Sequence, residues 1–181
     1  MITAIWMGPV WYTTASDMAS DMGIPTAITT ATGKATILMK MTKNKTFLIA
    51  EVGQAHDGSL GILHSYIDAL AATGVDAVKF QVHIAEAESS AAEPFRINFS
   101  YEDKTRYDYW QRMEFSLSQW RDIKAHCEEK QVEFIASPFS LAAVDLLEEL
   151  NVKRYKVGSG EVTNYLLLEK IALTGKPIIL S

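Results

Sequence analysis

The chain has 181 residues, of which 48% are hydrophobic and 22% charged, and its formal net charge is -5. This composition is typical of a globular protein with a sizeable core, and it lacks the basic excess of a nucleic-acid surface. No stretch approaches the roughly 20 uncharged apolar residues that span a bilayer, so we expect neither a nucleic-acid nor a membrane partner. The single cysteine, Cys127, has no internal disulfide partner, which favours a cytoplasmic location.

The composition changes near residue 41. Residues 1–40 are rich in Thr, Ala and Met, and breakers such as Gly23 and Pro25 interrupt every short period. We therefore expect an irregular extension over residues 1–40 that is foreign to a domain over residues 41–181 and makes few contacts with it. A misassigned start, a fusion scar or an unrelated extension would explain such a segment. The alternative is an ordinary N-terminal arm that packs on the domain.

From Thr46 onward, strand and helix patterns alternate. Short apolar runs predict five strands, at residues 47–52, 77–81, 132–136, 154–157 and 177–180. Helical periods lie between them, with expected caps at Ser116 or Ser118, at Ser140 and at Asn164. The first helical period ends at Gly74. Residues 83–115 form a long polar connection that carries several aromatic side chains.

This alternation of apolar strands and helices predicts an α/β fold with a parallel sheet. No Gly-x-Gly-x-x-Gly follows a strand, which disfavours a dinucleotide-binding sheet. In a (β/α)8 TIM barrel the reactive residues sit at the C-terminal ends of the strands, where the unusual polar residues fall here. We therefore predict a partial TIM barrel of about the first five β/α units, with strands in sequential order, and expect the chain to be a truncated portion of an enzyme.

Two lysines, Lys79 and Lys156, lie inside apolar strands. A buried lysine is costly unless an anion partners it, so the two predict a phosphate or another small dianion held between them. Serine hydroxyls nearby suit the oxygens of such an anion. We expect one cluster at the strand ends, formed by Lys79, Ser137, Lys156, Ser159 and Ser181. The alternative is that each lysine snorkels to the surface or pairs with a structural carboxylate.

Two carboxylates, Glu51 and Glu161, also follow strands. Each can accept hydrogen bonds from sugar hydroxyls or move a proton, and each can instead be the salt-bridge partner of a strand lysine. His56 and His83 follow the first two strands, with Asp57 or Glu86 nearby as further metal ligands. Their spacing matches no standard metal site, so we expect solvent-facing or core histidines. Cys127 lies on a helix away from the strand ends, which favours a packing role over a nucleophile.

Five blocks of sequence resemble the N-acetylneuraminate (sialic acid) synthase family in order and spacing. They are FLIAEVGQAHDG (47–58), VKFQ (78–81), SPF (137–139), KVGSGE (156–161) and KPIILS (176–181). Together they cover about residues 46–181, whereas residues 1–40 resemble nothing recognisable. Each block alone is weak, but the five in order are a specific signal.

The resemblance implies a TIM-barrel transferase of carbohydrate biosynthesis. Such an enzyme joins phosphoenolpyruvate to the open-chain aldehyde of N-acetylmannosamine or a related amino sugar, and a divalent metal, Mn or Mg, polarises the aldehyde. Matching positions imply phosphoenolpyruvate contacts at Lys79, Ser137, Lys156, Ser159 and Ser181. They also imply sugar contacts at Gln81 and Glu161, and a carboxylate near the reacting carbons at Glu51. Of these, Glu51, Lys156 and Glu161 are the expected catalytic residues.

The sequence departs from the family pattern in ways that affect activity. The metal-binding histidines and the C-terminal antifreeze-like domain of the family have no counterpart here, so we expect no metal ligands in this chain and no turnover by the chain alone. A homodimer is expected only of a full-length protein. Two other functions remain open: a non-catalytic barrel fragment, and a different TIM-barrel aldolase that uses Lys156 as a Schiff-base amine.

Overall fold

The structure, a computed structural model, describes residues 2–3 and 46–181. Its centre is a sheet in which the strands follow the order of the chain, β1 to β6. The five strands from β2 to β6 are parallel, and β1 (Ile2–Thr3) pairs antiparallel with β2. Sequential parallel strands joined by outer helices are the topology of a partial (β/α) barrel, as the sequence predicts.

The strands match the predicted ones to within two residues at each end. They are β2 (Ile49–Gly53), β3 (Ala77–Val82), β4 (Glu133–Pro138), β5 (Tyr155–Val157) and β6 (Ile178–Leu180). The first begins later than the apolar run because the Leu48 backbone is bonded to the turn before β3. Its N–H donates to Asp76 Oδ2 at 2.8 Å, and its carbonyl accepts from the Asp76 and Ala77 N–H groups.

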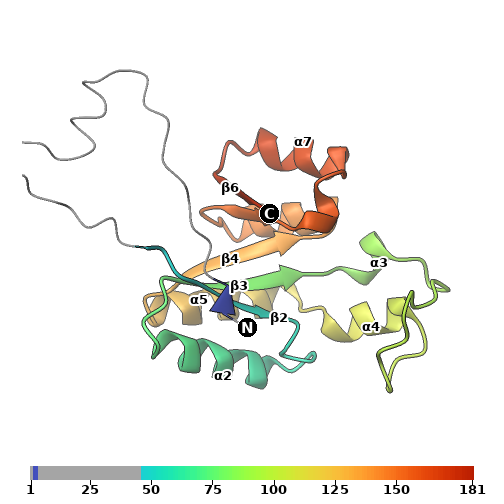
Figure 1. Cartoon of the computed structure of the whole chain (residues 1–181), viewed down its shortest axis with the longest axis horizontal. Coiled ribbons are helices and arrows are strands. Elements are labelled where there is room, and N and C mark those ends of the chain that lie inside the picture. The colour runs from blue at the N-terminus through green and yellow to red at the C-terminus, as the bar shows by residue number, and fades with distance from the viewer. Residues whose placement is uncertain (1, 4–45) are drawn as a thin grey trace, which may run out of the picture. The chain divides into compact units, whose positions relative to one another are not determined.

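The helices cover one face of the sheet and extend beyond its ends (Figure 1). They are α2 (Leu60–Ala71), α3 (Ala85–Glu88), α4 (Arg106–Met113), α5 (Leu117–Glu129), α6 (Leu141–Glu149) and α7 (Tyr165–Leu173). A short 3-10 helix, η1 (Ser159–Glu161), follows β5. The expected caps are present: Ser116, Ser140 and Asn164 each accept a backbone N–H of the first turn.

The connection between β3 and α5 is more ordered than its polar sequence suggests. It contains α3 and α4, which lie beyond the arrowhead of β3 (Figure 1). Thr105 and Asp108 form a reciprocal capping box that begins α4, and Tyr109 and Met113, one turn apart, are buried. The sequence analysis describes residues 83–115 as a long polar connection and does not predict these two helices.

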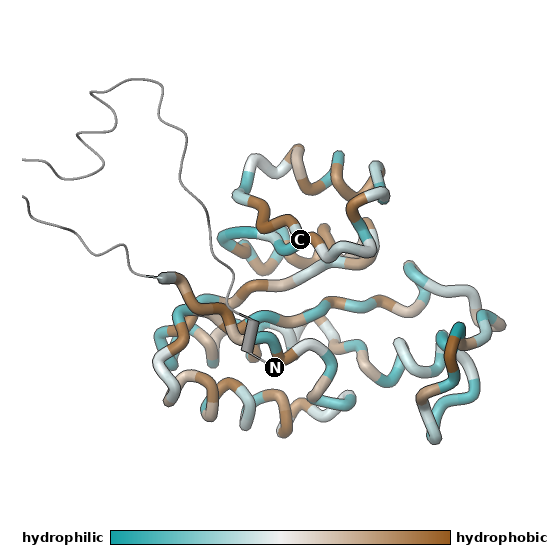
Figure 2. Tube along the Cα trace, viewed as in Figure 1, coloured by the Kyte–Doolittle hydropathy of each residue, from teal (hydrophilic) through white to brown (hydrophobic). Residues whose placement is uncertain are grey.

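The two faces of the sheet carry different cores. The larger core lies between sheet and helices and includes an aromatic cluster of Phe80, Trp120 and Phe134. Along α2, hydrophobic residues alternate with paler or teal ones (Figure 2), as expected of a helix that buries one face. The smaller core is a layer on the opposite, inner face, formed by Ile49, Ala77, Ile135 and Ile179. Barrel interiors are filled by such layers of side chains from neighbouring strands.

The predicted boundary near residue 41 lies outside the described residues. For Ile2–Thr3 the structure shows a contact with the domain, since Ile2 is in register with Ala50 and Thr3 with Ile49. The rest of the 1–40 segment is not described, so its foreign origin stays a prediction. None of the helices in residues 46–181 has the length and apolar character that crossing a membrane requires.

Candidate active site at the strand ends

The inner layer of apolar side chains determines where the polar residues lie. Side chains alternate between the two faces of a strand, so the residues two positions after the layer face the same side. Two positions after Ile49 and Ala77 come Glu51 and Lys79, which are in register with each other. Two residues after Lys79 comes Gln81, which is in register with Ser137 on β4. The parallel register thus gathers polar side chains above an apolar floor.

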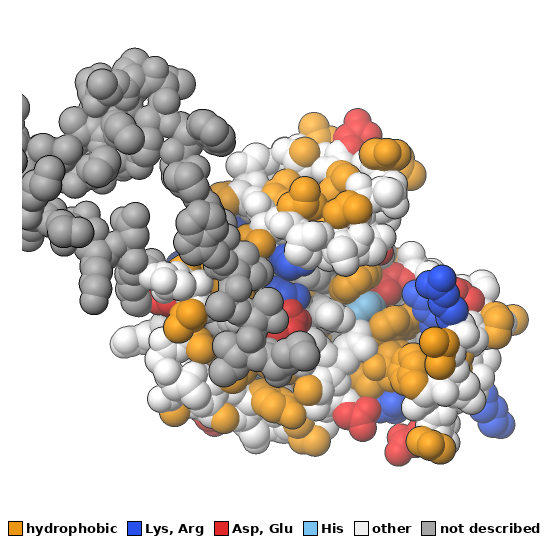
Figure 3. Space-filling model, viewed as in Figure 1, with side chains coloured by type: hydrophobic (Ala, Val, Ile, Leu, Met, Phe, Trp, Pro, Cys, Tyr) orange, Lys and Arg blue, Asp and Glu red, His pale blue; other side chains and the backbone are white. Residues whose placement is uncertain are grey.

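We call the group of Glu51, Lys79, Ser137, Lys156 and Ser181 the lysine site. Lys79 is buried, forms an ion pair with Glu51, and its Nζ lies 3.4 Å from Ser137 Oγ. Lys156 is also buried, and its Nζ donates to the Val157 carbonyl at 2.9 Å and to Ser181 Oγ at 2.6 Å. In Figure 3, basic and acidic side chains lie together in a hollow of the viewed face, with hydrophobic side chains on both sides.

The lysine site holds two lysines, Lys79 and Lys156, and one carboxylate, that of Glu51. Burial lowers the pKa of Lys156, and the neighbouring charge of Lys79 lowers it further, while Glu51 opposes the shift. The carboxylate of Glu51 is divided: Oε2 pairs with Lys79, whereas Oε1 is buried and has no hydrogen-bond partner among the described residues. Two buried cations near a single carboxylate, which pairs with Lys79, form a site that an additional anion would stabilise.

A small space beside Gly53 belongs to this site. Gly53 has φ +55, and a Cβ built on it would lie 3.6 Å from Glu51 Oε1 and 3.8 Å from Gln81 Nε2. The unpaired carboxylate oxygen and the amide nitrogen therefore flank the same space, which a larger side chain would fill. A ligand hydroxyl can donate to one of these atoms and accept from the other.

Ser159 and Glu161 lie apart from these contacts. Both belong to η1, where Ser159 is exposed and Glu161 Oε2 accepts a hydrogen bond from Asn164 Nδ2 at 2.9 Å. Of the two carboxylates expected to pair with a lysine or to serve the substrate, Glu51 is the one paired with Lys79. The structure brings together Lys79, Ser137 and Glu51, and separately Lys156 and Ser181.

A second group of polar residues adjoins Gln81. We call Gln54, Gln81, His83, Glu88 and Tyr109 the histidine network. His83 Nδ1 lies 2.7 Å from Glu88 Oε2, and His83 Nε2 lies 2.7 Å from Gln54 Nε2. Gln54 Nε2 also donates to Gln81 Oε1 at 3.1 Å, and Tyr109 donates to Gln54 Oε1 at 2.7 Å.

Aromatic rings hold His83 in place. Its ring stacks on Trp110 at 3.8 Å between centroids and on Phe139 at 4.3 Å, with interplanar angles of 11° and 14°. The sequence analysis expects a solvent-facing or a core histidine, and His83 is a buried one. Its hydrogen bonds also reach the candidate sugar contact Gln81. The sequence carries one signal for this: His83 lies two residues after Gln81 and so shares its face.

His56 and Cys127 have structural positions. His56 is buried against Phe115, and its Nδ1 accepts the Gly58 N–H at 3.1 Å. Burial lowers the pKa of His56 to about 4, so the ring is neutral near pH 7. Cys127 is free and buried, and burial raises the pKa of its thiol to about 12, as expected of a packing residue.

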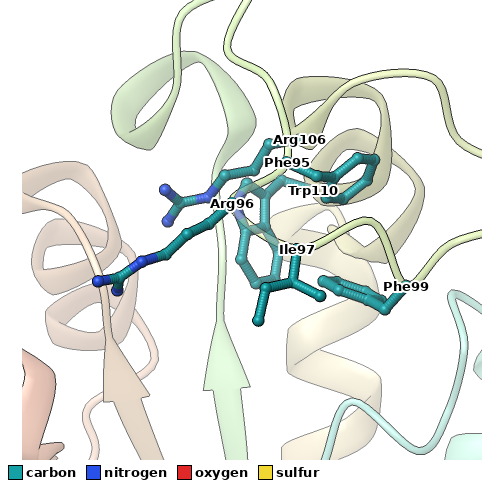
Figure 4. A pocket seen from close by; sticks show the side chains of 6 residues that line it. All are labelled: Phe95, Arg96, Ile97, Phe99, Arg106 and Trp110. Carbon is teal, nitrogen blue, oxygen red and sulfur yellow. The ribbon is translucent and has the colours of Figure 1, made fainter.

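The β3–α5 connection also forms an open pocket of about 390 Å³ beside the histidine network. Its lining includes Trp110, whose ring stacks on His83, together with Phe95, Arg96, Ile97, Phe99 and Arg106. The two arginine side chains extend to the same side, away from Phe99 (Figure 4). Arg106 is paired with Glu93 at 2.7 Å.

The described residues do not assemble a metal site. Among residues 46–181, no group of three or more His, Cys, Asp or Glu side chains is arranged to hold a metal ion. His56 and His83, with Asp57 or Glu86, are not such a set, since Nδ1 of His56 accepts a backbone N–H and Nδ1 of His83 faces Glu88. The residues present therefore do not fit the divalent metal that the resemblance implies.

Comparison with known proteins identifies the family. Residues 66–181 match the NeuB family. The chain belongs to the NeuB family. This confirms the resemblance to the N-acetylneuraminate synthase family, because its similar relatives bear the names of such synthases.

Two curated relatives illustrate the range of this family. The chain is 36% identical over 140 residues to the N,N'-diacetyllegionaminic acid synthase of Campylobacter jejuni, covering 76% of this chain and 42% of that protein. It is 36% identical over 138 residues to the human N-acetylneuraminate-9-phosphate synthase, covering 75% of this chain and 38% of that protein. The chain thus spans about two fifths of the length of these NeuB-type relatives.

Solved structures give the same fold. The N-acetylneuraminic acid synthetase from Leptospira borgpetersenii superposes with a TM-score of 0.60 and 29% identity, covering 73% of this chain and 42% of that one. A DAHP synthase from Thermotoga maritima superposes with a TM-score of 0.52 over 77% of this chain and 36% of its own, at 11% identity. The second likeness concerns the fold alone, and both agree with a partial TIM barrel.

Proposed function

We propose that this NeuB-family domain serves the condensation of phosphoenolpyruvate with N-acetylmannosamine or a related amino sugar, which yields a nonulosonic (sialic) acid and phosphate. The observation that carries the proposal is the pair of buried lysines, Lys79 on β3 and Lys156 on β5, which lie on the same inner face of the sheet. Relatives named for legionaminic, neuraminic and pseudaminic acid synthesis support this reaction class.

In this proposal the lysine site holds phosphoenolpyruvate. Lys79 and Lys156 neutralise its phosphate and carboxylate groups, and the hydroxyls of Ser137 and Ser181 donate to its oxygens. The electrostatics favour this assignment, since Lys79 lowers the pKa of Lys156 and an anion between them would reverse that effect. Ser159 is exposed next to β5, and we assign it a contact at the rim of the bound anion.

The sugar would lie on the Gln81 side of the same face. Gln81 and Glu161 are proposed to bind sugar hydroxyls, and Glu51 lies near the reacting carbons with its free Oε1. The enol carbon of phosphoenolpyruvate forms the new bond to the aldehyde carbon. A water oxygen adds to the former phosphate-bearing carbon, and phosphate leaves, so the atoms of both substrates and one water are accounted for. Glu51 is the proposed group for moving the proton in these steps.

The divalent ion, Mn or Mg, remains part of the proposal for the whole enzyme. The described residues do not form its binding set, so no step above is assigned to it. For the 181-residue chain by itself we expect anion binding without turnover. We also propose a cytoplasmic location, supported by the single buried free cysteine, and a family-like homodimer for the full-length protein.

The test is a calorimetric titration of the chain with phosphoenolpyruvate, followed by a phosphate-release assay with Mn and both substrates. We expect weak binding that Lys79→Met or Lys156→Met reduces by at least about tenfold, which corresponds to about 1.4 kcal/mol. Lys153→Met is the matched control, because Lys153 is an exposed lysine three residues before Lys156. Equal binding by all three variants would refute the lysine site as the anion site.

Turnover separates the remaining alternatives. Metal-dependent phosphate release by the chain, abolished in Lys156→Ala, would show that the chain is active without further residues. The aldolase alternative is favoured by one observation, the lowered pKa of Lys156 beside another cation, which is the environment of Schiff-base lysines. It predicts that borohydride traps a carbonyl substrate on Lys156, whereas the synthase reaction leaves no adduct. A non-catalytic fragment would at most bind an anion, and it would show neither phosphate release nor a trapped adduct.

A further inference from the structure

The histidine network has a defined hydrogen-bond direction at its Glu88 end. Both carboxylate oxygens of Glu88 face a nitrogen: Oε1 accepts from the Ile84 backbone N–H at 2.9 Å, and Oε2 lies 2.7 Å from His83 Nδ1. An ionised carboxylate accepts and has no proton to donate, so Nδ1 of His83 carries the proton. In the neutral ring, Nε2 is then an acceptor.

Gln54 transmits this direction to Gln81. Its amide nitrogen lies 2.7 Å from His83 Nε2 and 3.1 Å from Gln81 Oε1, two atoms that are themselves 3.3 Å apart, and with His83 in the Nδ1–H form it donates to both. Its oxygen accepts from the Tyr109 hydroxyl at 2.7 Å. Burial raises the pKa of Tyr109, so this phenol keeps its proton and donates it. The carbonyl oxygen of Gln81 is thereby occupied, and its NH2 group is left to face the lysine site.

The His83 ring cannot easily turn to reverse this order. Trp110 and Phe139 cover its two faces with centroid distances of 3.8 and 4.3 Å. The ionisable side chains around it come from separate elements: Glu88 on α3, Tyr109 on α4 through Gln54, and His56 from the turn after β2. Glu88 is the one in direct contact with the ring.

We infer that His83 is a positioning residue: in its Nδ1–H form it holds Gln81, through Gln54, with the NH2 group turned toward the space beside Gly53. There Gln81 donates to a ligand oxygen while Glu51 Oε1 accepts from a ligand hydroxyl, the pattern of a hydroxylated sugar. A proton on Nε2 would instead be donated to Gln81 Oε1, 3.3 Å away, and the amide nitrogen of Gln54 could no longer donate to His83. The sugar assignment rests on the proposed function, whereas the direction of the network does not.

The test is nitrogen NMR of the chain labelled with 15N at histidine and at glutamine side chains. The chain has four histidines, and the His83 signals are those missing from His83→Gln. We expect a protonated Nδ1 and an unprotonated Nε2 for His83 at pH 7.5. In Glu88→Gln the new amide can donate as well as accept, so His83 should no longer be restricted to the Nδ1–H form. The Gln81 side-chain signals should then shift. The control Glu86→Gln changes an exposed carboxylate on the same helix.

His83→Gln also tests the relay, since its side-chain oxygen can replace Nε2 as the acceptor for Gln54. We expect the Gln81 side-chain signals to stay near their wild-type positions in this variant. The inference is overturned if His83 carries its proton on Nε2 or on both nitrogens, or if Glu88→Gln shifts Gln81 no more than Glu86→Gln does. Each measurement uses the ligand-free chain, so failure of phosphoenolpyruvate binding leaves the result interpretable.

Discussion

The lysine site and the histidine network adjoin at the space beside Gly53, which Glu51 and Gln81 both flank, yet their polar atoms are paired to different degrees. In the histidine network Gln54 uses its oxygen and its nitrogen, and both oxygens of Glu88 accept. In the lysine site Glu51 Oε1 has no partner among the described residues, and the charge of Lys79 lowers the pKa of the buried Lys156. The first arrangement contributes stability and orientation, whereas the second gives up stability in the absence of an anion.

This difference explains why the two regions should respond in opposite ways to substitution. Removing a member of a satisfied buried network leaves its partners unpaired, which is costly. Removing a buried charge that lacks a full complement of partners relieves a cost and harms only binding.

The largest expected effect is that of His83→Ala. The substitution removes the ring between Trp110 and Phe139 and takes one hydrogen-bond partner from Glu88 and one from Gln54, so the free energy of unfolding should fall by about 3 kcal/mol or more. Urea unfolding followed by circular dichroism measures it. Tyr101→Ala, which removes a fully exposed ring from the same connection, should cost about 0.5 kcal/mol at most. Equal costs would contradict the supporting role of the network.

Acid should destabilise the domain through His56. Its pKa is lowered from the ordinary 6.5 to about 4, so the unfolded state binds the proton more tightly and stability falls as the pH drops from 6.5 to 4. The loss attributable to this group is about 3 kcal/mol. In His56→Asn, which keeps an acceptor for the Gly58 N–H, the difference in unfolding free energy between these pH values should shrink by that amount. An unchanged pH dependence would mean that His56 is not buried in the neutral form.

Lys156→Met should raise stability and remove anion binding. Burial and Lys79 disfavour the Lys156 charge, so an apolar side chain of similar length should add about 1 kcal/mol to the free energy of unfolding. Thermal unfolding with and without phosphoenolpyruvate measures both effects. The wild-type chain should be stabilised by the ligand, and the variant should not. A destabilised variant that still responds to the ligand would place Lys156 among the structural residues.

The smallest effect is expected for Glu51→Gln. Its carboxylate partly offsets Lys79 and Lys156, so its removal should tighten binding of inorganic phosphate a few-fold, about 1 kcal/mol or less. Calorimetric titration measures the change, with Glu86→Gln as the exposed control. Weaker phosphate binding in Glu51→Gln would indicate that Glu51 orients Lys79 more than it neutralises it.

Local signals in the sequence determined most of the fold. The five parallel strands and the caps at Ser116, Ser140 and Asn164 follow from apolar period and capping side chains, which act within a few residues. The meeting of Lys79 with Ser137 also follows, because parallel strands end at one edge and alternate residues share a face. Helix α4 was missed because its capping box and two buried residues lie within a polar stretch.

Tertiary structure alone decided which polar atoms meet. Gln54, Glu88 and Tyr109 lie on three different segments, and no local period relates them to His83; a side chain finds such partners only when the chain is folded. The same holds for the direction of Glu161, which η1 turns toward Asn164, and for the order of hydrogen bonds that leaves Gln81 with a free NH2 group. The residue types of the site can therefore be predicted from the sequence. Their hydrogen-bond partners cannot, because they depend on distances between helices and strands that sequence spacing does not encode.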